Sequence, residues 1–238
     1  ESFMGFLRPM LVLSLCCALL LAEPDFGAAI VLLATALVML FVAGARIRDF
    51  LVFFSTALVA MIVLAVTSPY RMKRLTAFLD PWADPYNSGF QLSNALIAFG
   101  RGDWFGTGLG HSMQKLFYLP HASNDFLAAV VAEELGFVGI VVLLALYLVL
   151  LWRGFGLAAQ ADRAGRPFAA RLCHGAAILI ALQAAINLGV NMGVLPTKGL
   201  TLPMMSYGGS SMVSSLMLVG LLLSVHRDMR RPPGKVRP

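Results

Sequence analysis

A single acidic residue stands where a polar segment meets a long apolar one. Asp125 lies in the stretch FYLPHASNDFLAAVVAEELG and directly precedes an apolar run over residues 126–151. The unpaired N–H groups and the positive dipole end of a helix starting there would hold the carboxylate ionised. Asp125 is therefore our first candidate for chemistry, and an ordinary helix cap is the alternative.

Two more carboxyls follow inside the predicted helix. Ionisable side chains are costly within a membrane helix and normally face the bundle interior or a wet cavity. Glu133 comes eight positions after Asp125, which places it about 80° around the helix and about 12 Å deeper. The spacing allows Asp125 and Glu133 to share one cavity, while a paired structural carboxyl is the alternative.

Further candidates lie in two breaks between apolar segments. Residues 23–27 read EPDFG and include Asp25, and the stretch PTKG includes Lys198. A lysine that faces acids indicates an ion pair or a phosphate contact, although Lys198 could also extend to the membrane interface. Ser206 and Ser210, in SYGGSS, are candidate substrate contacts, with close helix packing as the alternative.

A glycine-rich turn is the last candidate. Residues 101–110 read RGDWFGTGLG, and backbone N–H groups of such a turn can cradle an anion such as a diphosphate, with Arg101 beside it. The stretch is neither a Rossmann fingerprint nor a Walker loop, because no strand precedes it and no Lys-Ser/Thr pair closes it. An ordinary turn is the alternative. Gln91, upstream, either faces a ligand or caps a turn.

These residues must be positioned by membrane helices. Of the 238 residues, 59% are hydrophobic and 13% are charged, a composition typical of an all-α polytopic membrane protein. The three cysteines fall in apolar segments as small fillers, and the four histidines lack metal-ligand spacing. We expect six membrane helices, at residues 6–22, 27–43, 50–66, 126–151, 170–190 and 208–225.

The basic residues predict the orientation of these helices. Twelve of the eighteen Lys and Arg residues fall on one side of the membrane, which the positive-inside rule makes cytoplasmic. Both chain ends are then cytoplasmic, and residues 68–124 form a large extracytoplasmic loop. The basic tail, residues 227–238, is explained by membrane anchoring, so we expect no nucleic acid partner.

The outer segment carries structure of its own. Residues 71–79 (RMKRLTAFL) alternate basic and apolar positions, which favours a short interfacial helix, with a solvated surface helix as the alternative. Residues 91–99 predict a second amphipathic helix. Because the chain starts with Glu1, we take its single membrane domain, residues 1–238, as a segment of a longer protein.

Four separated motifs resemble the SEDS family (shape, elongation, division and sporulation) of bacterial cell-wall glycosyltransferases, and the KLFYLP wording is closer to its division branch. The family has ten membrane helices, so the six expected here resemble the last six. Asn124 and Glu23 depart from the family's usual Thr and Gln. The motifs are EPDFGAAI at residues 23–30, FQLSNALIAFGRGDWFGTGLG at 90–110, QKLFYLPHASNDFLAAVVAEELG at 114–136 and NMGVLPTKGLTLPMMSYGGSS at 191–211.

The resemblance implies that lipid II is polymerised into peptidoglycan at the outer face of the bacterial cytoplasmic membrane, at the division septum. Asp125 resembles the essential aspartate, and our hypothesis is that it acts as the general base on the acceptor sugar hydroxyl. Asp25, Gln91 and Lys198 resemble positions around the same cavity. Lys198, Arg101 or a divalent cation, Mg²⁺ or Mn²⁺, would stabilise the leaving diphosphate. No organic cofactor is expected.

The resemblance also implies partners, namely a class B penicillin-binding protein and division-site activator proteins. Two other functions stay open at this point. A lipid II transporter would use Glu133 and Glu134 in a translocation path. A scaffold would recruit wall-synthesis proteins through its basic tail.

Overall fold

The computed structural model describes residues 3–23, 25–44 and 46–230. Its described residues form helices and connecting loops without a strand, which confirms the all-α prediction. Most of the expected basic tail lies outside the described residues. The elements are α1 (Phe3–Ala22), α2 (Phe26–Val42), α3 (Ile47–Val66), α4 (Pro69–Leu79), α5 (Phe90–Gly102), the π-helical turn η1 (Gln114–Tyr118), α6 (Leu127–Arg163), α7 (Pro167–Asn191) and α8 (Gly209–Met229).

The six expected membrane segments correspond to α1, α2, α3, α6, α7 and α8. Within the described part of the chain, α6, α7 and α8 are long and apolar enough to cross a membrane, and α3 with α4 forms a bent fourth candidate. The apolar part of α1 and all of α2 are shorter. A chain with several such helices is a multi-pass membrane protein.

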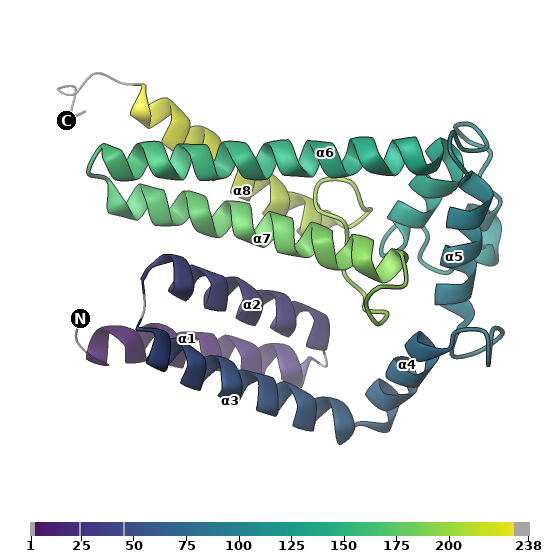
Figure 1. The fold of residues 1–238 in the computed structure, drawn as a ribbon, viewed down its shortest axis with the longest axis horizontal. Coiled ribbons are helices and arrows are strands. Elements are labelled where there is room, and N and C mark those ends of the chain that lie inside the picture. The colour runs from purple at the N-terminus through teal and green to yellow at the C-terminus, as the bar shows by residue number, and fades with distance from the viewer. Residues whose placement is uncertain (1–2, 24, 45, 231–238) are drawn as a thin grey trace.

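The long helices lie side by side in one bundle (Figure 1). α7 packs against α6, α8 and α2, and α2 in turn packs against α1 and α3. α4 and α5 lie together at one end of the bundle, whereas α1 begins and α8 ends at the opposite end. The first described turn of α1 and the last turn of α8 thus lie at the same end of the bundle, and the predicted cytoplasmic location of the chain ends stays a prediction.

Small residues let α6 and α7 approach closely. A methyl group added at Gly154 would lie 2.6 Å from the Cβ atom of Ala177. Ala158 and Cys173 are buried nearby in one apolar cluster with Leu222 of α8. Cys173 is therefore a small core residue, as expected, because such residues allow helices to pack tightly in a membrane.

A sharp bend separates α3 from α4. The two helices meet at 94°, and Pro69 occupies the first turn of α4. Proline has no N–H group and disfavours a helical residue before it, so α3 must end there and a new helix can start. α4 and α5 correspond to the two short helices expected in the outer segment.

The glycine-rich turn wraps around a kink in α6. At Gly136 the backbone adopts φ = +67°, which interrupts the helical hydrogen bonds. The N–H groups of Thr107 and Gly108 instead reach the carbonyls of Glu133 and Glu134, at 2.9 and 3.1 Å. The stretch is thus a structural turn that completes the backbone bonding of the kinked helix.

The contact between α5 and α6 predicts a strong effect of one methyl group. A Cβ atom at Gly102 would lie 1.9 Å from the carbonyl oxygen of Ala132. We expect Gly102→Ala to lower the free energy of unfolding by about 2–3 kcal/mol or more, because the two helices must separate. Thermal unfolding of the purified full-length protein in detergent measures this loss.

Gly100→Ala is the matched control, since it lies in the same helix and a Cβ atom there would meet nothing within 4 Å. Alanine should leave stability unchanged or raise it by up to about 1 kcal/mol. Equal melting temperatures for the two variants would contradict the packing argument.

Candidate active site

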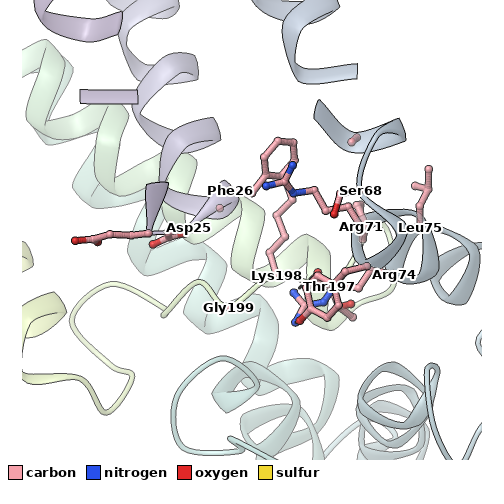
Figure 2. Close-up of a pocket in the computed structure, with 14 residues that line it drawn as sticks. Asp25, Phe26, Ser68, Arg71, Arg74, Leu75, Thr197, Lys198 and Gly199 are labelled. Atoms are coloured by element: carbon pink, nitrogen blue, oxygen red, sulfur yellow. Dashed lines mark hydrogen bonds between the residues drawn. The ribbon is translucent and has the colours of Figure 1, made fainter. Parts of the chain in front are cut away.

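A cavity of about 500 Å³ opens between three parts of the fold. Its walls come from the start of α2, from the bend between α3 and α4, and from the loop that joins α7 to α8 (Figure 2). The cavity holds three basic side chains, Arg71, Arg74 and Lys198. Such a concave site with a few convergent charged groups is the usual form of a small-ligand site.

Two of these cations lie on one aromatic ring. The Lys198 Nζ atom is 5.0 Å from the centroid of Phe26, and the Arg71 guanidinium carbon is 4.7 Å from it. Figure 2 shows both side chains converging on Phe26. The electron-rich ring face attracts each cation, so Phe26 keeps two positive charges from different elements close together.

The third cation joins α4 to the α7–α8 loop. Arg74 donates to the Thr197 carbonyl at 3.5 Å and packs over the ring of Tyr70. Arg71 and Arg74 were expected only as part of an interfacial helix, not as site residues. Their i, i+3 spacing, which puts both on one face of α4, was the available signal.

Burial changes the titration of Lys198. The side chain is half-buried, and desolvation lowers the pKa of its ammonium group to about 8. The charged form is therefore present at neutral pH and is lost as the pH rises through about 8.

Asp25 lies at the mouth of the cavity. Its carboxylate accepts the N–H of Ala28 at 2.9 Å, which caps the start of α2. The side chain is exposed and lines the cavity together with Glu23. Asp25 is thus both a helix cap and a rim residue.

Asp125 is not itself among the residues that line this cavity, but it lies next to the lining residue Gly199 of the α7–α8 loop. A Cβ atom at Gly199, a lining residue, would lie only 3.2 Å from the Asp125 Oδ2 atom. The loop therefore runs in contact with the carboxylate, and the absence of a side chain at Gly199 is what permits it. Lys198 directly precedes Gly199 in that loop.

The prediction that a helix start would favour the ionised form of Asp125 was wrong, because the surroundings of this carboxyl disfavour that form. α6 begins at Leu127 with Phe126 at its N-cap position, so Asp125 does not cap it. Burial raises the pKa of the Asp125 carboxyl, and the charges of His121 and Arg74 offset part of the rise. A base with a raised pKa accepts a proton more readily near neutral pH.

Side chains from other elements hold the backbone around Asp125. The Asp125 carbonyl accepts amide N–H groups from Asn187 and Asn191 of α7, each at 2.9 Å. Ser206 donates to the Asn124 carbonyl at 2.5 Å. Neither asparagine was predicted as a site residue, because an amide inside an apolar run gives no signal of its partner.

The other predicted serine lies apart from these contacts. Ser210 is exposed in the first turn of α8, where its carbonyl accepts the Ser214 hydroxyl at 2.8 Å. It is not among the described residues that line the cavity. Ser206, by contrast, is buried and joins the loop to Asn124.

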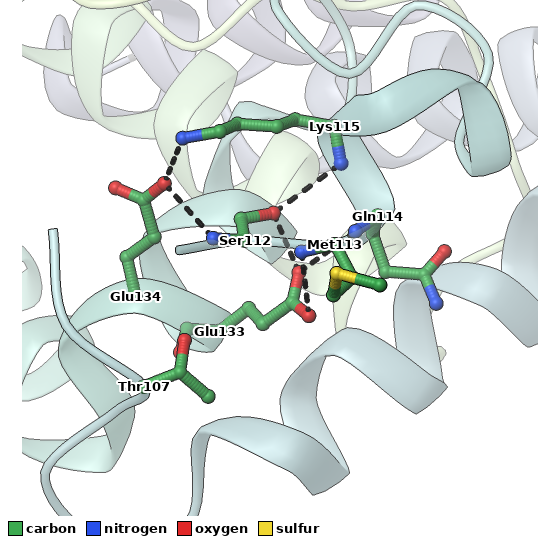
Figure 3. A network of polar contacts seen from close by, with 7 residues as sticks. All are labelled: Thr107, Ser112, Met113, Gln114, Lys115, Glu133 and Glu134. Carbon is green, nitrogen blue, oxygen red and sulfur yellow. Dashed lines mark hydrogen bonds and ion pairs between the residues drawn. The ribbon is translucent and has the colours of Figure 1, made fainter. Parts of the chain in front are cut away.

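Glu133 belongs to a separate buried network (Figure 3). Its carboxylate is 0% exposed and accepts the Ser112 hydroxyl at 2.5 Å and two backbone N–H groups at 3.1 and 3.2 Å. Arg101 pairs with it at 3.4 Å. Of the two alternatives from the sequence, the structural carboxyl fits these contacts, and Glu133 does not line the cavity near Asp125.

Glu134 occupies the place that was expected for an external anion. Its carboxylate pairs with Lys115 at 2.5 Å and accepts the N–H of Ser112 at 3.4 Å and a backbone hydrogen bond from Gly110. The N–H groups at the end of the glycine-rich turn thus bind an anion of the chain itself. Arg101 and the half-buried Gln91 both lie outside the lining of the cavity.

The described residues offer few ligands for a metal ion at this site. Across the described ranges, no group of three or more His, Cys, Asp or Glu side chains is arranged to hold a metal ion. A divalent cation at the cavity would need oxygen ligands from a bound diphosphate as well as from a carboxylate.

Known proteins resemble this chain over nearly its whole length. Residues 1–231 match the cell cycle protein family of FtsW, RodA and SpoVE. A probable peptidoglycan glycosyltransferase FtsW from Thioalkalivibrio sulfidiphilus is 62% identical over 228 residues, 96% of this chain and 57% of the relative. The corresponding protein of Legionella pneumophila is 53% identical over 100% of this chain and 60% of its own length.

Solved structures agree with the sequence relatives. A chain from a peptidoglycan synthase complex that coordinates polymerization and crosslinking is 36% identical, with a TM-score of 0.74, over 97% of this chain and 64% of that chain. The rod shape determining protein RodA of Thermus thermophilus is 32% identical, with a TM-score of 0.63, over 98% of this chain and 59% of its own. This chain therefore spans less than two thirds of these relatives and belongs to the FtsW, RodA and SpoVE family of cell cycle proteins, which confirms the resemblance to SEDS proteins.

Proposed function

We propose that this chain carries the catalytic site of a peptidoglycan glycosyltransferase that polymerises lipid II. One observation carries the proposal. A half-buried carboxylate, Asp125, lies next to a cavity that holds three cationic side chains at the end of a membrane helix bundle. That combination suits a lipid-linked sugar diphosphate, because it offers a base for the sugar hydroxyl and positive charge for the diphosphate.

In the proposed reaction, Asp125 removes the proton from the 4-hydroxyl of the acceptor N-acetylglucosamine. The hydroxyl oxygen attacks the anomeric carbon of the lipid-linked donor and forms the new glycosidic bond with inversion. The bond between that carbon and the diphosphate oxygen breaks, and undecaprenyl diphosphate leaves with the electron pair. The proton remains on Asp125 until solvent or the released diphosphate takes it.

Lys198, Arg71 and Arg74 stabilise the charge that develops on the leaving diphosphate. The three cations come from two elements and surround one cavity, so a diphosphate can contact more than one of them. The earlier candidate for this role, Arg101, is instead paired with Glu133. A divalent cation shared by a carboxylate and the diphosphate stays a proposal, to be tested by chelation.

The function of the whole protein includes partners and a location. We propose that it works with a class B penicillin-binding protein, a transpeptidase, and with division-site activators. The similarity to a chain from a peptidoglycan synthase complex supports a transpeptidase partner. We place the protein in the bacterial cytoplasmic membrane at the septum, with the end that carries α4 and α5 outside.

The transporter alternative receives no specific support from the geometry. A translocation path would need accessible intramembrane carboxyls. Glu133 is fully buried and paired with Arg101, and Glu134 is paired with Lys115. The two carboxyls that motivated this alternative therefore have structural partners.

The base assignment predicts that Asp125→Asn abolishes polymerisation. Asparagine keeps the size of the side chain and cannot accept the proton, so the rate should fall by at least about 100-fold. The assay follows polymer formation from purified lipid II by the full-length protein with its transpeptidase partner. Asp103→Asn makes the same change at an exposed outer residue that does not line the cavity and should retain activity. An active Asp125→Asn protein would refute the assignment.

The titration of two groups predicts a bell-shaped dependence of kcat/KM on pH. Activity is lost at low pH when Asp125 gains a proton, and its raised pKa places this limb above the ordinary aspartate value of about 4. Activity is also lost above about pH 8, when Lys198 loses its charge. Lys198→Arg should move only the alkaline limb to higher pH, since a guanidinium stays protonated. An unchanged alkaline limb would remove Lys198 from that role.

The diphosphate contact predicts different effects for two neighbouring cations of α4. Arg74→Gln should raise the KM for lipid II by about tenfold or more, because a charged hydrogen bond is lost. It should also move the acid limb upward, since Arg74 favours the ionised form of Asp125. Lys73→Gln, an exposed residue outside the cavity lining, is the control and should keep the wild-type KM. Equal KM values for both variants would exclude Arg74 from substrate binding.

A further inference from the structure

Two asparagines of α7 form a buried amide pair beneath the site. Asn187 and Asn191 are one helical turn apart and are 1% and 0% exposed. A buried amide must find partners for both of its donor hydrogens, because an unsatisfied polar group is costly in an apolar interior. The partners of these two amides lie almost entirely in segments that carry the site.

Asn191 joins the Asp125 segment to α7. Its Nδ2 group donates to the Asp125 carbonyl at 2.9 Å and to the Asn187 carbonyl at 2.9 Å. Its Oδ1 atom accepts the N–H of Ala129 in the first turn of α6, at 3.1 Å. One side chain thus binds the segment before α6 and an N–H group in the first turn of α6, which also reaches the Phe126 carbonyl at 3.0 Å.

Asn187 adds a second connection. Its Nδ2 group donates to the Asp125 carbonyl at 2.9 Å and to the Leu200 carbonyl at 2.5 Å. The N–H of Leu200 in turn reaches the Lys198 carbonyl at 2.9 Å. A single amide therefore connects the backbone of Asp125 with the loop that carries Lys198.

We infer that Asn187 and Asn191 are positioning residues that hold the Asp125 carboxylate in register with Lys198. This inference rests on the proposed function. Both amides bind the Asp125 carbonyl rather than its carboxylate, so they leave the carboxylate free for the reaction. Asn187 alone fixes both partners of the site, whereas Asn191 fixes only the Asp125 side.

Because the two amides hold different segments, their loss should change kcat and KM differently. A displacement of about 1 Å can reduce catalysis by about 100-fold. Asn191→Ala should lower kcat by at least about tenfold with little change in KM. Asn187→Ala should lower kcat by a similar factor and also raise KM, because it frees the Lys198 loop as well.

The pH dependence of kcat/KM distinguishes a positioning role of the two asparagines from a general contribution to stability. The charged groups that act on Asp125 are His121 in the preceding loop and Arg74 on α4, and Lys198 directly precedes Gly199, the loop residue next to the carboxylate. Burial is the main influence on the Asp125 carboxyl. A carboxylate released toward water should titrate at lower pH, so both variants should move the acid limb of kcat/KM downward.

Gln183 provides a matched control on the same helix and the same loop. Its Nε2 group donates to the Thr201 carbonyl at 3.3 Å and does not contact the Asp125 carbonyl. Gln183→Ala loosens the loop without touching Asp125 and should keep the acid limb of the wild type. If it shifts that limb as far as Asn191→Ala does, the loop's general stability is responsible and the inference fails.

The experiment measures kcat, KM and their pH dependence with lipid II, using full-length protein with its transpeptidase partner and correcting each rate for folded protein. Asn191→Ala gives the decisive result on its own if Asn187→Ala does not fold. Wild-type kcat and acid limb in Asn191→Ala, beside an inactive Asp125→Asn, would overturn the positioning role and leave the proposed function intact. An active Asp125→Asn protein would instead overturn the proposed base, and the positioning role with it.

Discussion

The site depends on bringing an irregular loop into a bundle of membrane helices. Non-helical backbone is tolerated at such a place only where its N–H and C=O groups find partners within the protein. The α7–α8 loop meets this requirement with bonds to its surroundings: Asn187 binds the Leu200 carbonyl, Tyr147 binds the Pro203 carbonyl, Ser206 accepts the Leu202 N–H, and the Tyr207 N–H reaches the Ser123 carbonyl. The same bonds hold the loop where Gly199 contacts Asp125 and Lys198 lines the cavity, so the loop that satisfies its own backbone groups also assembles the site.

A second polar network lies at the other side of α6 and has a different role. Glu133, Glu134, Arg101 and Lys115 tie the glycine-rich turn and η1 to the kinked helix. Close contacts at Gly102 and Gly106 leave no room for a side chain between α5 and α6. The start of α6 is thus fixed from one side by a charged network and from the other by the amides of α7. Because Asp125 lies just before this start, both sets of contacts fix its position.

Much of the fold could be predicted from the sequence, because apolar runs long enough to cross a membrane leave few alternatives. The motifs around Asp125, Asp25 and Lys198 also indicated residues of the site, since Asp25 and Lys198 line one cavity and Asp125 lies next to its lining residue Gly199. Arg71 and Arg74 were assigned only to an interfacial helix, since Pro69 marks where α3 ends but does not reveal the 94° angle that α4 makes with it. Arg101 and Gln91 were placed near the ligand because they belong to motifs, although their positions are set by α5 and α6. The direction of the pKa shift at Asp125 required the actual start of α6 and the burial produced by the loop, neither of which a periodic pattern contains.

The length of α6 bears on how the proposed substrates would meet. The part of α6 after its kink at Gly136, residues 137–163, spans about 40 Å, beyond the roughly 30 Å of hydrocarbon in a bilayer. In the proposed topology, the cavity beside Asp125, which is lined by Arg71 and Arg74 of α4, lies at the outer end of the bundle near the level of the lipid phosphates. A prenyl diphosphate can then reach it while its tail stays among the acyl chains. Encounter becomes a two-dimensional search by lateral diffusion, and the quantity that governs saturation is the surface density of substrate in the leaflet, not its concentration in bulk solution.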